Sequence, residues 1–307
     1  MVGNRYHFLY GSNPGQSGSV GSGNGFAFPL RAEAGTLSYN NMLDAVRALA
    51  IARRLSLLTG GPAAASVKNG LPVGAALVAD TEPASAETLA RAARFARPDG
   101  AVNDCVAMTC EIDAPEAQAL GSMGLDVVVV PRISGGIRPD TRCRTRTRFA
   151  TVNMVAFDRL QHVARPVHQH YGLFFEEDRE ALVNDRTLGL LGGLTEAGPG
   201  PVVLAVAAVE NTLHRALAAS AGDRVVACVG AAQTESGAVS ELCDRLDQLD
   251  REMWGEAIVV ASGVNLSQDG IASLGAAGVA CVLQPDGSSA GAHPPVYATQ
   301  QRLIRRW

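Results

Sequence analysis

The pattern of apolar and polar positions along the chain predicts helices that alternate with strands. Helical periodicity, with apolar residues three or four positions apart, marks four segments: residues 41–58, 85–96, 202–213 and 240–253. Short apolar runs of strand length mark five more: residues 71–79, 127–130, 224–229, 257–261 and 279–283. Asn40 or Asn41 is expected to cap the first helix, and Ser85 the second. This alternation indicates an α/β fold with partly parallel sheets.

Breaks in this rhythm predict how the chain is divided. Residues 10–25 are rich in glycine and serine and are expected to form a loop. The rhythm changes again near residues 149–170, so we expect two lobes, residues 1–155 and residues 156–307. A length of 307 residues agrees with two lobes, because it is about twice that of an ordinary domain.

Composition and charge favour a small-molecule ligand. Hydrophobic residues make up 47% of the chain and charged residues 18%, as in an ordinary globular protein. A net charge of -4 argues against nucleic acid as the main partner, because phosphates are bound by a basic surface. The first residues lack the apolar core of a leader, and no apolar run reaches the roughly 18 residues of a membrane span. We therefore expect a cytoplasmic protein without a membrane partner.

Cysteines, histidines and arginines give weaker signals. The six cysteines form no CxxC or Cys/His cluster, so neither a disulfide framework nor a metal site is expected. His168 and His170 have strand alternation without a third ligand nearby in sequence, and they are interpreted as structural. Four arginines alternate with smaller residues: Arg142, Arg144, Arg146 and Arg148. In a strand their guanidinium groups would share one face, either as an anion-binding face or, the interpretation we favour, as a solvated edge that deters aggregation.

A single lysine stands among the basic residues. Lys and Arg together number 26, and Lys68 is the only lysine. Lysine is a compact ammonium whose pKa falls readily on burial, which suits proton transfer or contact with a carbonyl group. The alternative is that Lys68 is an ordinary surface residue.

Five parts of the chain carry recognisable motifs. In order they are Tyr10-Gly11-Ser12-Asn13-Pro14-Gly15-Gln16, Leu37-Ser38-Tyr39-Asn40-Asn41-Met42-Leu43-Asp44, Val67-Lys68-Asn69-Gly70-Leu71-Pro72-Val73-Gly74, Gly230-Ala231-Ala232-Gln233, and Gln268-Asp269-Gly270-Ile271 followed by Gln284-Pro285-Asp286-Gly287-Ser288. They resemble, respectively, RYGxNPHQ, LSYNNxxD, VKHxNPCG, GAGQ, and RDGI followed by QPGGS. These motifs belong to the formyltransferase half of the bifunctional purine-biosynthesis enzyme, which formylates aminoimidazole carboxamide ribonucleotide (AICAR). The ordered set is far more specific than any one motif.

The resemblance implies a fold, a co-substrate and an assembly. It implies two cytidine-deaminase-like α/β/α lobes with mixed sheets, and a homodimer with active sites at the subunit interface. It also implies formyl-tetrahydrofolate as co-substrate and a small-molecule acceptor. The zinc signature of true deaminases, H-x-E with P-C-x-x-C, is missing, so hydrolytic deamination is not expected. The family's cyclohydrolase domain has no counterpart in this chain, so ring closure is not expected either.

The resemblance also assigns candidate site residues by position. Lys68 and Asp269 would lie beside the transferred formyl group, with Asn69 at the position of the family's histidine. Lys68 could stabilise charge in the tetrahedral intermediate, and Asp269 could orient a folate nitrogen or a water. The alternative for Asp269 is a helix N-cap before Ile271. Substrate- or cofactor-binding residues are expected at Tyr10, Gly11, Asn13, Asn40, Asn41, Asp44, Gln233, Gln284 and Arg302. For Arg302, an anion contact competes with a solvated terminal charge.

Four departures from the family pattern concern acceptor binding and proton transfer. The family's histidine after the lysine is Asn69, which can form hydrogen bonds but cannot take a proton. Leu9 replaces an arginine that contacts phosphate, and Gly15 replaces a histidine. A register without gaps also places Ala216 where the family has a functional asparagine. His214 could supply a base, although a helix-surface histidine is the favoured interpretation.

The sequence therefore predicts a formyltransferase whose acceptor has changed. The leading hypothesis is transfer from formyl-tetrahydrofolate to an amine or an electron-rich carbon of a small acceptor in specialised metabolism. Three alternatives remain: an AICAR formyltransferase with a different base, a catalytically silent folate- or nucleotide-binding protein, and a different reaction on the same scaffold.

Overall fold

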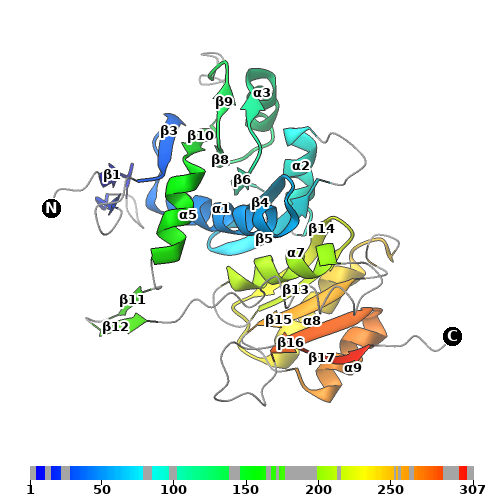
Figure 1. The fold of residues 1–307 in the computed structure, drawn as a ribbon. Helices are drawn as coiled ribbons and strands as arrows, with labels where there is room; N and C mark the ends of the chain where they lie inside the picture. Colours follow the sequence, from blue (N-terminus) through cyan, green and yellow to red (C-terminus); the bar gives the residue numbers. More distant parts are fainter. Residues whose placement is uncertain are drawn as a thin grey trace.

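The chain folds around one large mixed sheet. The computed structural model describes residues 5–10, 15–21, 28–78, 85–96, 102–137, 146–163, 167–170, 173–176, 199–212, 216–251, 254, 257–262, 266–285 and 297–302. Eleven strands of this part are hydrogen-bonded in the order β17-β16-β15-β13-β14-β5-β4-β6-β8-β10-β3 (Figure 1). The sheet is mixed, because β6, β8 and β10 run parallel while β4 and β5 form an antiparallel hairpin.

The strands of the large sheet are short. They are β3 (Leu30–Ala34), β4 (Ala63–Lys68), β5 (Leu71–Leu77), β6 (Cys105–Met108), β8 (Val127–Val130), β10 (Arg148–Val152), β13 (Ala216–Ala221), β14 (Arg224–Gly230), β15 (Ile258–Ser262), β16 (Cys281–Pro285) and β17 (Tyr297–Arg302). Three two-stranded sheets pair β1 (Arg5–His7) with β2 (Ser19–Gly21), β7 (Ile112–Asp113) with β9 (Ile133–Ser134), and β11 (Val167–His170) with β12 (Leu173–Glu176). The helices are α1 (Tyr39–Thr59), α2 (Ala86–Ala93), α3 (Ala114–Gly121), α5 (Met154–Val163), α7 (Pro199–Glu210), α8 (Glu235–Asp247) and α9 (Gln268–Ala277).

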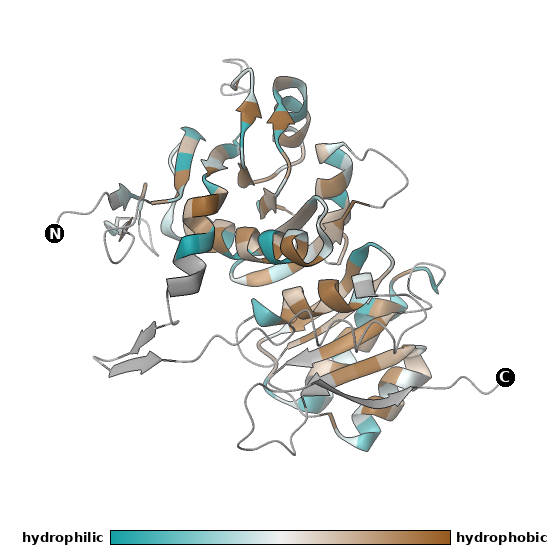
Figure 2. Cartoon of the chain, viewed as in Figure 1, coloured by the Kyte–Doolittle hydropathy of each residue, from teal (hydrophilic) through white to brown (hydrophobic). Residues whose placement is uncertain are grey.

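Helices cover both faces of the sheet, so the described core has three layers. Successive strand residues point to opposite faces. In β4, Ala63 and Ala65 join the cluster that includes α1 and α7, whereas Ala64 joins the cluster beneath α2 and α3. In the other half of the sheet, Leu217 packs beneath α8 and α9. Figure 2 shows hydrophobic residues concentrated in the strands and on the helices that lie against them.

The same order of elements occurs twice. Apart from the two-residue strand β7 between β6 and α3, the series α1-β4-β5-α2-β6-α3-β8 is matched by α7-β13-β14-α8-β15-α9-β16, with the same sequence of antiparallel and parallel pairings. The two series join where β14 pairs antiparallel with β5, with Arg224 opposite Ala76. The mixed α/β class is therefore confirmed. The cytidine-deaminase-like lobes and their boundary at residues 155 and 156 stay predictions.

Several predicted helix boundaries were wrong, and the capping residues give the reason for two of them. The helix predicted at residues 202–213 instead runs from Pro199 to Glu210. Ser38, rather than Asn40 or Asn41, caps α1, because the Ser38 hydroxyl accepts a hydrogen bond from the Asn41 backbone N–H at 3.2 Å. The helix predicted at residues 240–253 begins at Glu235 and ends at Asp247. Its start is fixed by Thr234, whose hydroxyl accepts from the Gly237 N–H at 3.1 Å. The predicted cap at Ser85 is confirmed.

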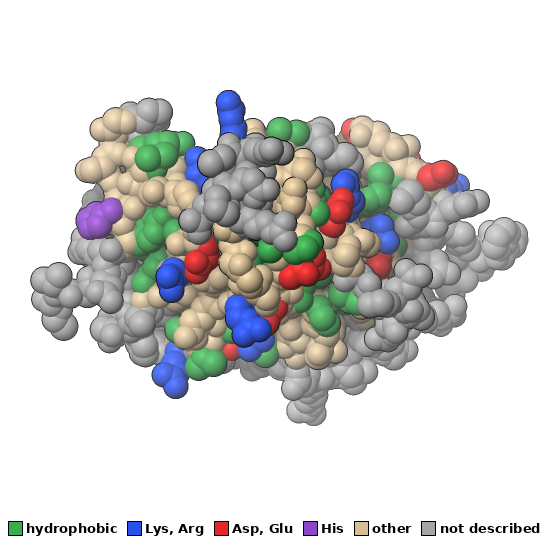
Figure 3. All heavy atoms as spheres, turned by 90° about the horizontal axis from the view of Figure 1, so that it is seen from above, with side chains coloured by type: hydrophobic (Ala, Val, Ile, Leu, Met, Phe, Trp, Pro, Cys, Tyr) green, Lys and Arg blue, Asp and Glu red, His purple; other side chains and the backbone are tan. Residues whose placement is uncertain are grey.

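Charged side chains of both signs are mixed on the described surface (Figure 3). Figure 3 shows basic and acidic side chains interspersed on the face drawn, without a continuous basic area. None of the described helices combines the length and the apolar character needed to cross a bilayer.

Of the four alternating arginines, Arg142 and Arg144 lie outside the described residues, and Arg146 precedes β10, which begins at Arg148. The one-faced row of four arginines therefore stays a prediction.

Candidate functional site

Two motif segments lie at neighbouring strand ends in the middle of the large sheet. β4 ends at Lys68, and antiparallel pairing places Leu71, the start of β5, opposite it. β14 runs antiparallel to β5 and ends at Gly230, where a Cβ atom would lie 2.9 Å from Cδ2 of Leu71. The VKNGLPVG and GAAQ segments, far apart in sequence, are thus neighbours. We call the region formed by residues 68–71 and 230–233 the turn edge.

The β4–β5 turn explains the residue types at positions 69 and 70. Asn69 has φ 51° and Gly70 has φ 80°, and positive φ at both central residues is what a tight type I′ hairpin turn requires. Asn-Gly is the preferred pair in such turns. Asn69 therefore has a local structural role, which the sequence signal of Asn-Gly between two apolar runs could have revealed.

Asp44 holds this turn from beneath. Its Oδ2 accepts a hydrogen bond from the Asn69 N–H at 2.8 Å, and its Oδ1 accepts from the Gly70 N–H at 2.7 Å. The residue is 7% exposed. Burial raises the pKa of this carboxyl group, and the two N–H groups and Arg47 oppose that effect only in part. Because both oxygens are bound within the chain, a contact between Asp44 and substrate or cofactor stays a prediction.

Replacing Asp44 with alanine is expected to lower the free energy of unfolding by about 2–4 kcal/mol, because two backbone N–H groups of the turn lose their acceptor. The pH dependence should change as well. The folded pKa lies above the ordinary value of 3.8, so the carboxyl contributes stability that is fully present below pH 3.8. That contribution is lost as the pH rises through the folded pKa.

Urea unfolding of the wild type, Asp44→Ala and Asp44→Asn across this pH range measures both effects. Asp44→Asn cannot titrate, so its stability relative to the wild type should improve as the pH rises through the window. Parallel curves for the wild type and Asp44→Asn, or an Asp44→Ala variant as stable as the wild type, would contradict the assignment.

Lys68 lies half-buried at the end of β4, beside the turn. Its Nζ donates a hydrogen bond to the carbonyl oxygen of Val102, in the segment that leads into β6. Among the described residues no ion pair joins Lys68 to an acidic side chain, and the partner seen for its ammonium group is a neutral carbonyl. An ammonium in that state can interact with a polarised carbonyl of a substrate.

The first two motif segments are tied together at the start of α1. The carbonyl oxygen of Tyr10 accepts from the Tyr39 N–H at 3.1 Å, and the Leu9 N–H donates to the Leu37 carbonyl at 3.0 Å. Leu9 is 58% exposed, and Asn40 is also exposed. This end of α1 is thus held against the first loop, and Gly11 and Asn13 of that loop lie outside the described residues.

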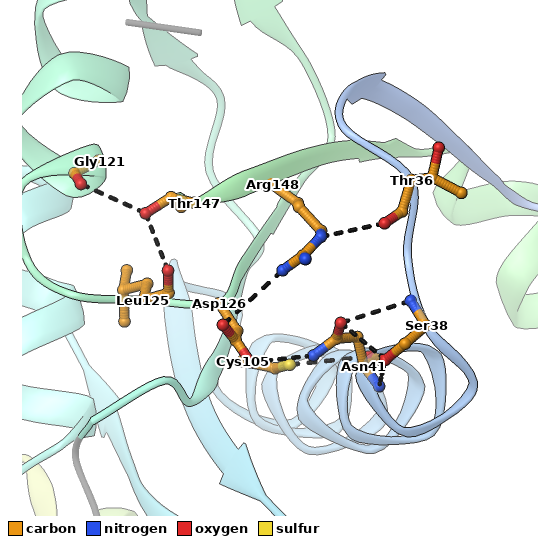
Figure 4. A network of polar contacts seen from close by, with 9 residues as sticks. All are labelled: Thr36, Ser38, Asn41, Cys105, Gly121, Leu125, Asp126, Thr147 and Arg148. Atoms are coloured by element: carbon orange, nitrogen blue, oxygen red, sulfur yellow. Dashed lines mark hydrogen bonds and ion pairs between the residues drawn. The ribbon is translucent and has the colours of Figure 1, made fainter. Parts of the chain in front are cut away.

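Asn41 is itself buried and belongs to a partly buried polar network at the start of α1. Its Nδ2 donates to Oδ2 of Asp126 at 3.1 Å, and Asp126 also lies 3.7 Å from Nη1 of Arg148 (Figure 4). Nε of Arg148 donates to the Thr36 carbonyl at 3.0 Å. The network fixes α1 to the neighbouring strands. Ligand contact by Asn41, one of the expected binding residues, stays a prediction.

The motifs of the second half meet where α8 and α9 begin. Gln233 is exposed just before the cap of α8. Oε1 of Glu235 accepts from the Ser267 N–H at 2.6 Å and from the Ser267 hydroxyl at 2.7 Å, which joins the two helix starts. Ser267 also caps α9, so the alternative interpretation of Asp269 as the N-cap is wrong. Asp269 is exposed in the first turn and lines a groove of about 1000 Å³ between α8 and α9.

The structure keeps Lys68 and Asp269 apart within one chain. Lys68 ends β4, whereas Asp269 follows β15, and these strands lie four positions apart in the sheet. The ordinary strand spacing makes that about 19 Å. The described parts of the chain show no contact between the two residues. For Gln284 and Arg302 only the strand positions are described, in β16 and β17, so their side-chain roles stay predictions.

Comparison with known proteins relates the chain to one family. The family model for the AICARFT/IMPCHase bienzyme matches residues 2–196. The bifunctional purine biosynthesis protein PurH of Synechococcus sp. (strain WH7803) is 32% identical over 166 residues, which is 52% of this chain and 30% of that protein. PurH of Cyanothece sp. (strain PCC 7425 / ATCC 29141) is 26% identical over 303 residues, which is 96% of this chain and 56% of that protein. The matched region thus covers between 30% and 56% of the length of these two relatives.

Proposed function

Because the chain belongs to the AICARFT/IMPCHase bienzyme family, we propose that it transfers a formyl group from formyl-tetrahydrofolate to an amine or electron-rich carbon of a small acceptor. One observation carries this proposal. Lys68, the sole lysine, stands without an anionic partner among the described residues, beside a turn that a buried carboxylate holds in place. A fixed ammonium of this kind suits a reaction in which negative charge develops on a carbonyl oxygen.

The reaction needs a polarised carbonyl and a positioned nucleophile. The acceptor nitrogen attacks the formyl carbon, and the Lys68 ammonium stabilises the negative charge on the formyl oxygen. When the tetrahedral intermediate collapses, the bond between the formyl carbon and the folate nitrogen breaks. The proton lost by the acceptor amine ends on that folate nitrogen, so the products are a formamide and tetrahydrofolate. Orientation of the two substrates supplies much of the acceleration.

Asn69 sets a condition on the acceptor. Its amide cannot take a proton, and loss of a general base costs about two to four orders of magnitude in rate. An acceptor that is more nucleophilic than the amine of AICAR would need less help from a base. This reasoning supports an acceptor other than AICAR, from specialised metabolism. With such an acceptor the reaction could proceed with asparagine at position 69, where the positive φ of the turn also favours this residue.

The family relationship also supports a second candidate, an AICAR formyltransferase that uses a different base. Both PurH relatives are described as purine biosynthesis proteins. A direct assay with AICAR distinguishes the two candidates, because the first predicts little turnover of that acceptor and the second predicts ordinary turnover.

We further propose a homodimer in which two chains complete each reaction centre. The separation of the two residues within one chain supports this arrangement, because Lys68 ends β4, whereas Asp269 lies in α9 after β15, and β4 and β15 lie four positions apart in the sheet. Exposed apolar side chains also support a contact surface. Leu9 (58%), Tyr39 (36%) and Leu43 (41%) lie at or beside the start of α1, and Val102 (55%) is the residue that Lys68 contacts. Sedimentation of the purified chain measures the oligomeric state.

If Asp269 belongs to the reaction centre, Asp269→Asn should lower turnover much more than stability. The side chain is exposed and does not cap α9, so its structural contribution is limited to the helix dipole, about 0.3–1 kcal/mol. Loss of a group that orients the reacting atoms should cost about 100-fold in kcat. Asp244→Asn, on the exposed face of α8, is the matched control. Equal activity of the two variants would remove Asp269 from the reaction centre.

The function itself is tested by a mass-shift screen. The protein is incubated with formyl-tetrahydrofolate and a pool of amines, and products heavier by one carbonyl group are sought. A single such product identifies the acceptor. A protein that binds formyl-tetrahydrofolate but forms no product with any pooled amine would favour the silent binding protein.

A further inference from the structure

A second cation lies beside the β4–β5 turn. A Cβ atom on Gly70 would come within 2.2 Å of Nη1 of Arg47, so the guanidinium group occupies the space directly over that glycine. The φ of 80° is the reason for glycine at position 70, and the absence of a side chain there leaves room for the guanidinium. Arg47 is half-buried on α1, three residues after Asp44 and on the same face of the helix.

No ion pair joins this guanidinium to a described acidic side chain. The charge of Arg47 lowers the pKa of the Asp44 carboxyl group, although burial raises it by more. Both Asp44 oxygens, however, are already bound by the N–H groups of Asn69 and Gly70, and the two side chains form no ion pair. A half-buried guanidinium with open donors favours a bound oxyanion, to which it can present two parallel N–H groups.

Arg47 and Lys68 flank the same two-residue turn. Lys68 is the last residue of β4, and Gly70 lies beneath the Arg47 guanidinium. Among the described residues neither cation forms an ion pair with an acidic side chain, although the charge of Arg47 acts on Asp44 through space. Asp44 accepts hydrogen bonds from two backbone N–H groups of the turn, so the three side chains around the turn carry two positive charges and at most one negative charge. Two cations of different shape, the ammonium of Lys68 and the guanidinium of Arg47, therefore lie beside the same two-residue turn.

We propose that Arg47 is the oxyanion-binding residue of this site and that it holds a carboxylate or phosphate group of a substrate over Gly70. The inference rests on the proposed function for the identity of the reaction, but anion binding can be measured without it. Bound there, the anionic group fixes one end of the substrate within reach of the Lys68 ammonium. The site thus selects an anionic substrate. Arg47 of α1 supplies the cation, whereas the first loop has Leu9 at the position where the family pattern has an arginine.

The direct test is an anion titration followed by NMR of the Gly70 amide. Inorganic phosphate and acetate serve as separate probes on the full chain. Saturable shifts at Gly70 are expected with at least one probe, and the preferred probe tells a phosphate from a carboxylate ligand. In Arg47→Gln the affinity should fall about 10- to 100-fold, the usual effect of removing a charged hydrogen-bond donor. Arg47→Lys should retain part of the affinity, because it keeps the charge and loses the paired N–H groups.

Arg31→Gln is the matched control. Arg31 has a side chain that is 82% exposed on β3, at the far border of the sheet, so the same charge change there should leave the titration unaltered. Absence of saturable shifts at Gly70 in the wild type, or equal affinities in the wild type and Arg47→Gln, would overturn the proposal. A normal spectrum of Arg47→Gln without anion verifies that the turn itself is intact.

Kinetics separate this inference from the proposed function. With an acceptor found in the screen, Arg47→Gln should raise the KM of the anionic substrate about 10- to 100-fold and leave kcat nearly unchanged. A raised KM for formyl-tetrahydrofolate alone would identify the folate carboxylates as the bound anion. If no acceptor is ever formylated, the proposed function fails while the anion titration still decides the role of Arg47.

Discussion

Replacing Lys68 with arginine is expected to lower kcat for formyl transfer by at least about 100- to 1000-fold, the usual effect of losing one group that stabilises an oxyanion. The charge survives in this variant, but the guanidinium is wide and planar and cannot occupy the place of an ammonium. The fold should be unaffected, because the one interaction of the Lys68 side chain with the described residues is its hydrogen bond to the Val102 carbonyl. Steady-state kinetics and thermal unfolding of the same samples measure the two properties.

Lys68→Gln is the companion variant. It keeps a hydrogen-bond donor and removes the charge, so it shows whether charge or shape dominates. Both variants should be as stable as the wild type within about 0.5 kcal/mol, as is usual for surface substitutions. Near-normal turnover of Lys68→Arg would remove Lys68 from the centre of the mechanism, whatever the acceptor proves to be.

The second large effect concerns AICAR. The natural protein is expected to formylate AICAR weakly or not at all, because three residues in its motif segments differ from the family pattern. Leu9 removes a phosphate-binding cation, Gly15 an imidazole and Asn69 a proton acceptor. Without a cation at position 9, Arg47 would be the one guanidinium facing the phosphate, and a dianionic phosphate is poorly accommodated where too few cations surround it. The missing base alone accounts for about two to four orders of magnitude in rate.

Restoring Leu9→Arg and Asn69→His together should raise AICAR turnover. Leu9 is 58% exposed, so a longer side chain can be accommodated. Asn69 has φ 51°, a region in which histidine is among the better-tolerated residues, and its imidazole has an unperturbed pKa near neutrality. Leu57→Arg, an equally exposed leucine of α1 at 57%, controls for the added charge. Ordinary AICAR turnover by the unmodified chain would instead indicate a monofunctional purine enzyme.

Local sequence patterns predicted the elements of the fold better than their arrangement. The apolar runs around Leu71 and Val127 and the helical period after Asn41 each depend on neighbours in sequence, and the corresponding elements were found. Caps were less certain, because Ser38, Asn40 and Asn41 are all good capping residues and only the hydrogen bond to Ser38 decides between them. The pairing of β14 with β5 joins segments about half the chain apart, which no local pattern encodes.

The candidate site shows the same limit. Motif resemblance pointed to Lys68 and Asp44, but it could not show that Asp44 binds the turn after Lys68, because that contact spans 25 and 26 residues. The motif comparison treated Asn69 as a lost histidine, but the residue also has a structural reason, its positive φ in a two-residue hairpin turn. Arg47 lies outside every motif, and only its position over Gly70 distinguishes it from the other arginines.

The central claim is that this chain moves a formyl group and that Lys68 takes part, and following the formyl carbon itself tests it most directly. The wild type and Lys68→Arg are incubated with formyl-tetrahydrofolate labelled with ¹³C in the formyl group and with the same pool of amines. The account predicts that the label appears in a new formamide with the wild type, together with one equivalent of tetrahydrofolate, and at least about 100-fold more slowly with Lys68→Arg. Label that stays on the folate with the wild type, or that moves equally fast with both proteins, would contradict it.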